Sequence, residues 1–263
     1  MTRVEWDAVG ARFYEAGVDR GVLYISGQPG VPWNGLTSVT ENASGGDAQP
    51  FYVDGDKFLN LSAPEEFQAT LTAFTYPDEF GPCDGSVAVR PGLFATRQRR
   101  QPFGLTYRTR VANDVSGTFA YKIHLIYNAL AAPSNRTHKS LTDSSTPDDF
   151  SWKLTALPPI MAGYRRTSHL ILDSRYLDAT TLAYIEDILY GDDDDAPRLP
   201  ALSELTDLID NGATLSLTDN GDGSYSMTAP LDILSMADPN IFLLTWDGIT
   251  LSEDGTTYTI TTP

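Results

Sequence analysis

The sequence has few of the residues from which redox centres and structural metal sites are built. Its 263 residues include one cysteine, Cys83, and three histidines. One Cys excludes an internal disulfide, and one Cys with three His cannot form a Cys₄ or Cys₂His₂ zinc cage. Asp84 follows Cys83 directly, and its charge raises the pKa of the neighbouring thiol. We therefore expect no reactive thiolate.

Long apolar runs and basic residues are also scarce. No apolar run approaches the roughly 20 residues of a membrane-spanning helix, and the charged start Met1–Asp7 does not resemble an export signal. Lys and Arg number 18 against 35 Asp and Glu, which gives a net charge of -17. Such a surface repels nucleic acid and anionic membranes, which excludes a classical sequence-specific DNA-binding protein. We expect synthesis in a cytoplasm and no membrane partner.

Alternation of apolar and polar residues is the dominant pattern. Phe103–Val111 and Phe119–Tyr127 each place aromatic and β-branched residues on one face, and Asn113–Gly117 between them predicts a hairpin. In the second segment Lys122 and His124 fall on the opposite face. Further strands are predicted at Val22–Ser26, Thr37–Thr40, Phe51–Val53, Lys57–Leu61, Glu66–Thr75, Phe150–Leu157 and Thr167–Asp173. The pattern predicts a mainly β protein, a β-sandwich or partial barrel.

One convincing helix is predicted in this main region, over Asp178–Tyr190. Its stripe is Leu182, Ile185 and Leu189, Asp178 is the N-cap and Gly191 ends it. The charged, Pro-flanked stretch Asp192–Pro200 is typical of a linker. We therefore predict a core domain, 1–196, and a C-terminal module, 197–263.

The predicted C-terminal module is acidic and β-rich. It begins with a short helix whose stripe is Leu202, Leu205 and Ile209, ended by Gly212. A hairpin around Asp219–Gly223 joins Thr214–Thr218 to Ser224–Thr228, and strands follow at Ile241–Trp246 and Thr256–Thr261. We expect this module to be dispensable for any assembly that the core domain makes, which a chain truncated after Ala196 tests.

The sequence offers no recognisable catalytic, cofactor-binding or metal-ligating set. His124, His138 and His169 lie outside any triad or nucleophile-elbow motif, so we expect them to face solvent or satisfy local hydrogen bonds. The acidic runs Asp192–Asp195 and Asp219–Asp222 lack the calcium-loop spacing and are typical of turns.

The only basic cluster lies in Tyr76–Arg100, a long stretch with little strand pattern and several Gly and Pro. It is either a solvated excursion or an arm that contacts a neighbouring copy. We favour the arm, with Phe80 and Phe94 as apolar anchors and arginines that pair with acidic groups of the neighbour. These arginines are Arg97, Arg99 and Arg100, and Arg90 belongs to the same cluster. The loop Gly27–Gln49 is expected to join the same contact.

A set of segments across the main region carries a family resemblance. They are Gly21–Gly35 (GVLYISGQPGVPWNG), Leu36–Glu41, Tyr52–Gly55, Phe58–Leu61, Glu66–Phe67, Phe74–Phe80, Phe103–Thr109, Asn128–Ser134, Phe150–Trp152, His169–Arg175 and Leu182–Gly191. Together they resemble the major tail tube proteins of long-tailed, non-contractile bacteriophages of actinobacteria. None of them is a catalytic signature.

The resemblance implies a β-sandwich or partial barrel with one flanking helix, and a virion protein made in the bacterial host's cytoplasm. Copies would form hexameric rings that stack into a tube, through which the genome passes without specific binding. It also implies contacts with tape measure, terminator and distal tail proteins, and neither enzyme activity nor a cofactor. In such proteins an appended module lies on the outside of the tube.

Two other classes of function stay open. A carbohydrate-binding β-sandwich would also be acidic and aromatic, but it needs exposed aromatic residues along a groove, and Trp6, Trp33, Trp152 and Trp246 are scattered in the sequence. An enzyme with paired carboxylates is not testable from the sequence, because 35 acidic residues make any one pair uninformative.

Overall fold

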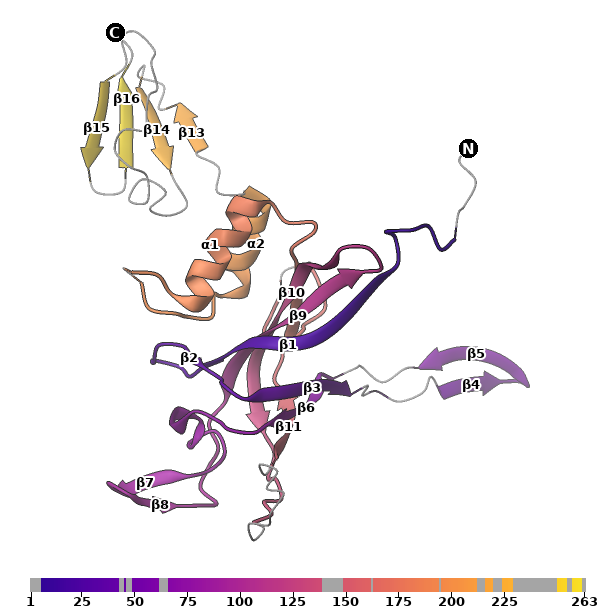
Figure 1. The fold of residues 1–263 in the computed structure, drawn as a ribbon. Helices are drawn as coiled ribbons and strands as arrows, with labels where there is room; N and C mark the ends of the chain where they lie inside the picture. Colours follow the sequence, from indigo (N-terminus) through magenta and orange to yellow (C-terminus); the bar gives the residue numbers. More distant parts are fainter. Residues whose placement is uncertain are drawn as a thin grey trace. The chain divides into compact units, whose positions relative to one another are not determined.

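The computed structural model describes residues 6–42, 45, 49–61, 66–138, 149–161, 163–193, 195–211, 216–219, 224–228, 250–254 and 257–261. Two compact units are present, Met1–Tyr176 with Asp187–Pro200 and Leu177–Glu186 with Ala201–Pro263. The described part is mainly β, and every strand pair is antiparallel (Figure 1). The predicted fold class is therefore confirmed. The predicted Gly212, Asn220–Gly223 and Ile241–Trp246 lie outside the described residues.

The first unit is built on an eight-stranded sheet of order β2-β1-β9-β10-β11-β6-β3, with β12 also paired to β10 (Figure 1). Its strands are β1 (Phe13–Tyr24), β2 (Val31–Pro32), β3 (Leu36–Asn42), β6 (Gln68–Ala73), β9 (Phe103–Asn113), β10 (Gly117–Ala131), β11 (Phe150–Ala156) and β12 (His169–Asp173). A Cβ on Gly21 of β1 would lie 3.0 Å from Leu36 of β3, so the sheet curls until its two ends approach. No hydrogen-bonded strand pair closes this partial barrel within the described chain.

Aromatic side chains fill the curled sheet. Trp33, Phe80 and Trp152 are at most 3% exposed, and the Phe80 ring centroid lies 4.6 Å from Trp33 and 5.2 Å from Trp152. Phe80 ends a short 3₁₀ turn, η1 (Asp78–Phe80), and fixes it to the core. The assignment of Phe80 to a contact with another copy is corrected here, because a side chain with 0% exposure has no surface to offer.

The helix predicted in the main region is α1 (Ala179–Tyr190), and its caps are as expected. Asp178 Oδ2 accepts hydrogen bonds from the backbone N–H of Thr180 and of Thr181, at 2.9 and 3.2 Å. Gly191 has φ 79° and donates its N–H to Asp187 O. The predicted stripe of Leu182, Ile185 and Leu189 is buried.

The stretch predicted as a linker is instead attached to the first unit. Gly30 N–H donates to Pro197 O at 2.7 Å, and Arg198 N–H donates to Ile188 O at 2.8 Å. The division between the units falls after Pro200, and the first half of α1 belongs with the second unit. The division into a core domain, 1–196, and a C-terminal module, 197–263, stays a prediction.

The second unit contains the first half of α1, the helix α2 (Leu202–Asn211) and a four-stranded sheet. On α2, Leu202, Leu205 and Leu208 are buried while Ile209 is 38% exposed, so Leu208 replaces Ile209 in the predicted stripe. The sheet has the order β13-β14-β16-β15, formed by β13 (Ser216–Asp219), β14 (Ser224–Thr228), β15 (Thr250–Asp254) and β16 (Thr257–Thr261). No helix of the described chain has the length and apolar character that a membrane crossing needs.

Candidate assembly interface

A two-stranded hairpin, β4 (Gln49–Val53) with β5 (Asp56–Leu61), stands apart from the main sheet in its hydrogen bonding. Every residue of both strands is exposed. The hairpin therefore buries no apolar side chain within this chain, although six of them are large: Phe51, Tyr52, Val53, Phe58, Leu59 and Leu61. Such an exposed apolar patch indicates a contact surface.

A second separate hairpin, β7 (Val87–Arg90) with β8 (Leu93–Ala95), lies within the segment predicted to have little strand pattern. The prediction missed the Pro91-Gly92 turn between two apolar runs, where Gly92 has the φ of 78° that favours glycine. Its apolar residues are again exposed: Val87, Val89, Leu93 and Phe94, the last at 62%. Phe94, unlike Phe80, is thus free to contact another copy.

The arginines of this segment divide into two kinds. Arg97 and Arg99 are exposed. Arg100 is half-buried and donates from a guanidinium nitrogen to Asp84 O at 2.9 Å, with Asp84 Oδ1 3.6 Å away. Trp152 Nε1 donates to the same Asp84 carboxylate. Arg100 therefore holds its own loop in place, and the candidate contact with a neighbour keeps Arg97 and Arg99.

Three strands of the main sheet have an edge without a partner strand in the described chain. β3 pairs only with β6, and β12 pairs only with β10. β1 pairs with β9 along its length, but β2 covers its other edge only at Val22 and Leu23. Free backbone donors and acceptors along such edges pair readily with a strand of another chain.

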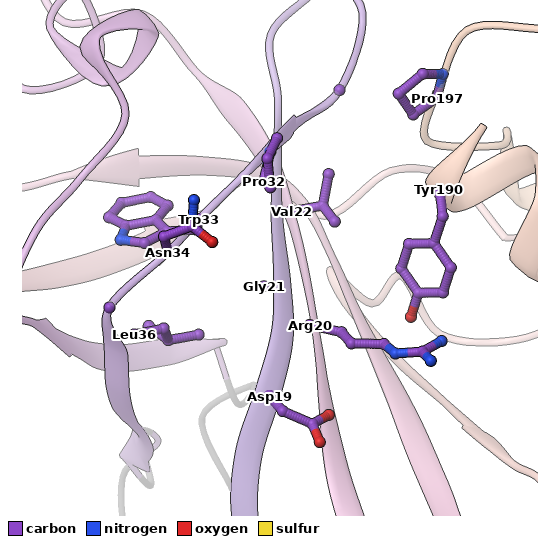
Figure 2. Close-up of a pocket in the computed structure, with 12 residues that line it drawn as sticks. Asp19, Arg20, Gly21, Val22, Pro32, Trp33, Asn34, Leu36, Tyr190 and Pro197 are labelled. Carbon is purple, nitrogen blue, oxygen red and sulfur yellow. The ribbon is translucent and has the colours of Figure 1, made fainter.

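One open cavity of about 530 Å³ lies beside β1, where Arg20 has φ 47° and the pairing with β9 shifts register (Figure 2). Arg20 lies 5.6 Å from the ring centroid of Tyr190, which lines the cavity with Pro197. Trp33 also lines it, yet is only 3% exposed and has no free face on which a sugar would stack. Trp33 therefore supplies no aromatic platform of the kind that the carbohydrate-binding alternative requires, and Arg20 lies over the ring of Tyr190.

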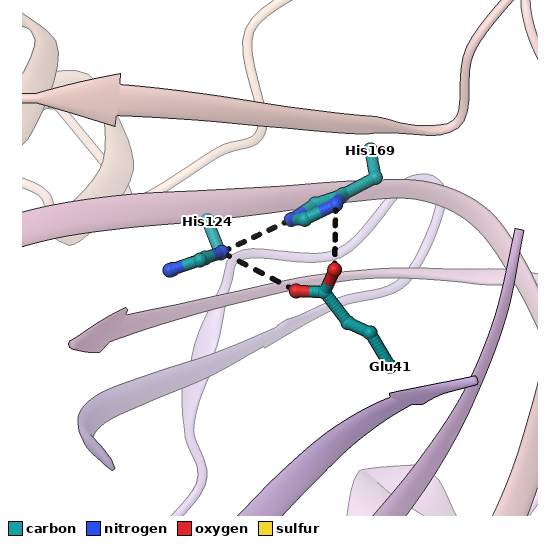
Figure 3. A group of neighbouring side chains, drawn as sticks. All are labelled: Glu41, His124 and His169. Carbon is teal, nitrogen blue, oxygen red and sulfur yellow. Dashed lines mark hydrogen bonds and ion pairs between the residues drawn. The ribbon is translucent and has the colours of Figure 1, made fainter. Parts of the chain in front are cut away.

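The structure brings together three residues that the sequence analysis treated separately. His124 of β10, His169 of β12 and Glu41 of β3 offer ligand atoms that all lie within 4.8 Å of one another (Figure 3). His124 was expected to face solvent or to satisfy a local hydrogen bond; it is only 6% exposed, and its ring nitrogens lie 3.0 Å from Thr109 Oγ1 and from His169 Nε2. Ile126 pairs with His169, so His124, two residues before Ile126, is a diagonal neighbour of His169. This neighbourhood follows from strand pairing, which the sequence analysis did not predict.

Burial shapes the protonation of this group. It lowers the pKa of His124 to about 4, with a further contribution from the neighbouring His169, and burial likewise lowers the pKa of His169. Burial therefore favours the neutral form of both imidazoles. Cys83, in contrast, is fully buried, and burial with the nearby Asp84 charge raises its pKa to about 12, as expected for an inert thiol.

No family model and no curated protein matches this chain. Solved structures with some similarity come from contractile injection systems. A sheath–tube complex of the PVC extracellular contractile injection system has 12% identity over 65% of this chain and 94% of that chain, with a TM-score of 0.34. The tube-terminating cap of the anti-feeding prophage has 10% identity over 66% and 96%, with a TM-score of 0.35.

A third similar structure, the PVC sheath/tube terminator, has 14% identity over 65% of this chain and 99% of that chain, with a TM-score of 0.31. TM-scores in this range are too low to establish a shared fold.

Proposed function

We propose that this protein is a structural subunit of a bacteriophage tail tube. Copies of the chain assemble into hexameric rings, and the rings stack into a hollow tube that serves as the conduit for the genome. The protein acts through its contacts with itself, with the tape measure protein, and with terminator and distal tail proteins at the ends of the tube. It has no enzyme activity.

The observation that carries the proposal is the pair of hairpins, β4–β5 and β7–β8. An isolated two-stranded hairpin is marginally stable in water, and each of these exposes its large apolar side chains. The burial that would stabilise them is missing within the chain, so it has to come from another copy. A subunit that completes its fold by assembly needs such projecting apolar elements.

The sheet edges and the charge support the same proposal. The unpaired edges of β1, β3 and β12 suit strand addition between neighbouring copies, which extends a sheet around a ring. A net charge of -17 suits a conduit along which DNA slides without binding. Arg97 and Arg99 supply local positive charge beside β8, where carboxylates of a neighbour would pair with them. This polar part of the contact weakens with salt, whereas the part made by Phe94 does not.

The test is electron microscopy and sedimentation of the purified chain and of three variants. The wild type should form tubes. L93S/F94S should stay unassembled, because it removes apolar surface from the β7–β8 hairpin without touching the core. R97E/R99E should assemble at least about tenfold less at low salt, because it reverses both charges.

The matched control is Tyr164→Ser, which removes a side chain that is 75% exposed outside both hairpins and should leave assembly unchanged. Far-UV circular dichroism checks that each variant is folded. A wild type that stays monomeric under all conditions, or a folded L93S/F94S chain that forms normal tubes, would contradict the proposal.

A further inference from the structure

The Glu41–His124–His169 group has the spacing of a set of metal ligands. His124 Nδ1 lies 3.0 Å from His169 Nε2, and 3.7 Å from Glu41 Oε1. Glu41 Oε2 lies 3.6 Å from His169 Nδ1. An imidazole binds an ion through one nitrogen, so each residue offers one ligand atom, and the three ligand atoms lie within 4.8 Å of one another. Ligand atoms bound to tetrahedral zinc at 2.0–2.1 Å are about 3.4 Å apart, so a turn of the His169 ring and small movements of the other two side chains place the three atoms around one ion.

The hydrogen bonds around His124 determine which of its nitrogens carries the proton. The single hydroxyl proton of Thr109 is donated to Glu15 Oε2 at 3.3 Å. Thr109 Oγ1, 3.0 Å from His124 Nε2, must therefore accept a hydrogen bond from that nitrogen. A metal-binding imidazole is neutral, so with the proton on Nε2 the His124 ring presents the lone pair of Nδ1 toward His169.

The remaining groups then have more acceptors than donors. If His169 Nε2–H donates to His124 Nδ1, the lone pair of His169 Nδ1 faces the Glu41 carboxylate, which is itself an acceptor. Tyr107 O–H donates to Glu41 Oε1 at 3.1 Å, and this hydrogen bond leaves the facing lone pairs of Glu41 Oε2 and His169 Nδ1 without a donor between them. A cation placed between the three residues resolves this mismatch of lone pairs.

We propose that Glu41, His124 and His169 bind a divalent transition metal ion of the zinc class. Two imidazoles and one carboxylate are the ligand types that Zn²⁺ takes in three-ligand sites, with water as the fourth ligand. Hard cations such as Mg²⁺ and Ca²⁺ prefer sites made wholly of oxygen ligands, so the two imidazole nitrogens lower the affinity of this site for them.

The surroundings already have the form of an outer coordination shell. Thr109 fixes His124 as the Nε2–H tautomer, which directs Nδ1 to the ion, and Tyr107 orients Glu41. The Tyr107 ring also stacks on His124 with ring centroids 4.5 Å apart, and Phe67 lies 5.2 Å from the His169 ring. These contacts hold both imidazoles in place before the ion arrives.

The ion would join strands that the sheet leaves separate. Glu41 is on β3, whose only pairing is with β6, whereas His124 and His169 are on β10 and β12. Metal binding therefore ties the edge strand β3 across to β10 and β12 and holds the curl of the partial barrel. This role is independent of tube formation.

The experiment uses the full chain, stripped with a chelator and then titrated with ZnCl₂. We expect one Zn²⁺ per chain and, at about 100 times the dissociation constant, a rise in melting temperature of about 5 to 10 °C. CoCl₂ should give the visible absorption of a four-coordinate site with nitrogen ligands, while MgCl₂ and CaCl₂ should change neither readout.

Three variants assign the ligands. E41Q keeps the hydrogen bond from Tyr107 but removes the charge, and should weaken zinc binding at least about tenfold. H169N should abolish it. H138N makes the same chemical change at an exposed histidine and should bind like the wild type. Circular dichroism without metal checks that each variant is folded.

Binding of less than stoichiometric zinc by the folded wild type would overturn the proposal, as would equal loss of binding in H138N and H169N. The outcome can be separated from that of the assembly proposal, because metal content and melting temperature are measured equally well on unassembled chains.

Discussion

At the scale of single residues, Asp19 is the clearest electrostatic contact of the sheet. Its carboxylate accepts hydrogen bonds from Arg108 at 2.7 and 3.1 Å and from Arg110 at 2.8 Å. The hydrogen bond from Arg108 is the main cause that lowers the pKa of Asp19 below its usual 3.8. The three side chains join β1 to β9 beside the irregularity at Arg20, where φ is 47°.

Replacing Asp19 by Asn should lower the free energy of unfolding at pH 7 by about 1 to 2 kcal/mol, because two partly solvated charged partners are lost. The folded pKa is below the unfolded one, so the contribution of Asp19 is complete well above pH 3.8 and is lost as the pH falls through the lowered value. Urea titrations at pH 7 and pH 3 measure this. Asp56→Asn, at an exposed position, is the control. If the free energies of unfolding of D19N and the wild type differ by the same amount at both pH values, the charge of Asp19 is not the cause of the lower stability of D19N.

At the scale of elements, α1 depends on its first cap. Asp178→Ala should lower stability by about 1 kcal/mol, because the N–H groups of Thr180 and Thr181 lose their acceptor. Asp178→Ser restores an acceptor and should recover most of the loss. Thermal unfolding followed by circular dichroism at 222 nm, a helix signal, measures both variants. A melting curve for D178A that coincides with that of the wild type would mean that packing alone sets the stability of α1.

Strands and helices with strong periodicity were predictable from the sequence, and those with interrupted periodicity were not. Phe103–Val111 and Phe119–Tyr127 lie within β9 and β10, as predicted. β1 was predicted only from Val22, because Gly17 and Arg20, both with positive φ, interrupt the alternation over its first half. A backbone irregularity shifts side chains between faces, which hides a strand from a pattern of period two.

For the candidate site residues, the success of the prediction depended on whether local or long-range structure places the side chain. Phe94, Arg97 and Arg99 were predicted to contact a neighbouring copy, and their exposure leaves that prediction open. Phe80 was misplaced, and the proximity of His124 to His169 and Glu41 was missed, because both depend on strands distant in sequence. Composition and spacing predict local structure. Contacts between β3, β10 and β12 can be predicted only when the pairing of the strands in the sheet is known.

At the scale of the whole molecule, the division into two units changes where the chain should be cut to test the role of its acidic C-terminal part. Truncation after Ala196, the boundary predicted from the sequence, removes Pro197, whose carbonyl accepts from Gly30 N–H. It also removes α2, which shares the second unit with the first half of α1 and buries Leu202, Leu205 and Leu208. The shorter chain therefore loses more than the C-terminal sheet.

A chain that ends at Asn211 keeps α1, α2 and the Pro197 contact, and lacks only the residues that follow α2. We expect this chain to fold and to form tubes like the full-length protein, because both exposed hairpins and all three open sheet edges are retained. The chain that ends at Ala196 should melt several degrees lower, since it loses the apolar burial that α2 contributes to the second unit and leaves Gly30 N–H without its acceptor. Electron microscopy and thermal unfolding of the two chains, prepared in parallel, measure the difference. If the chain ending at Asn211 is folded but stays unassembled, the C-terminal sheet belongs to the assembly interface rather than being dispensable for it.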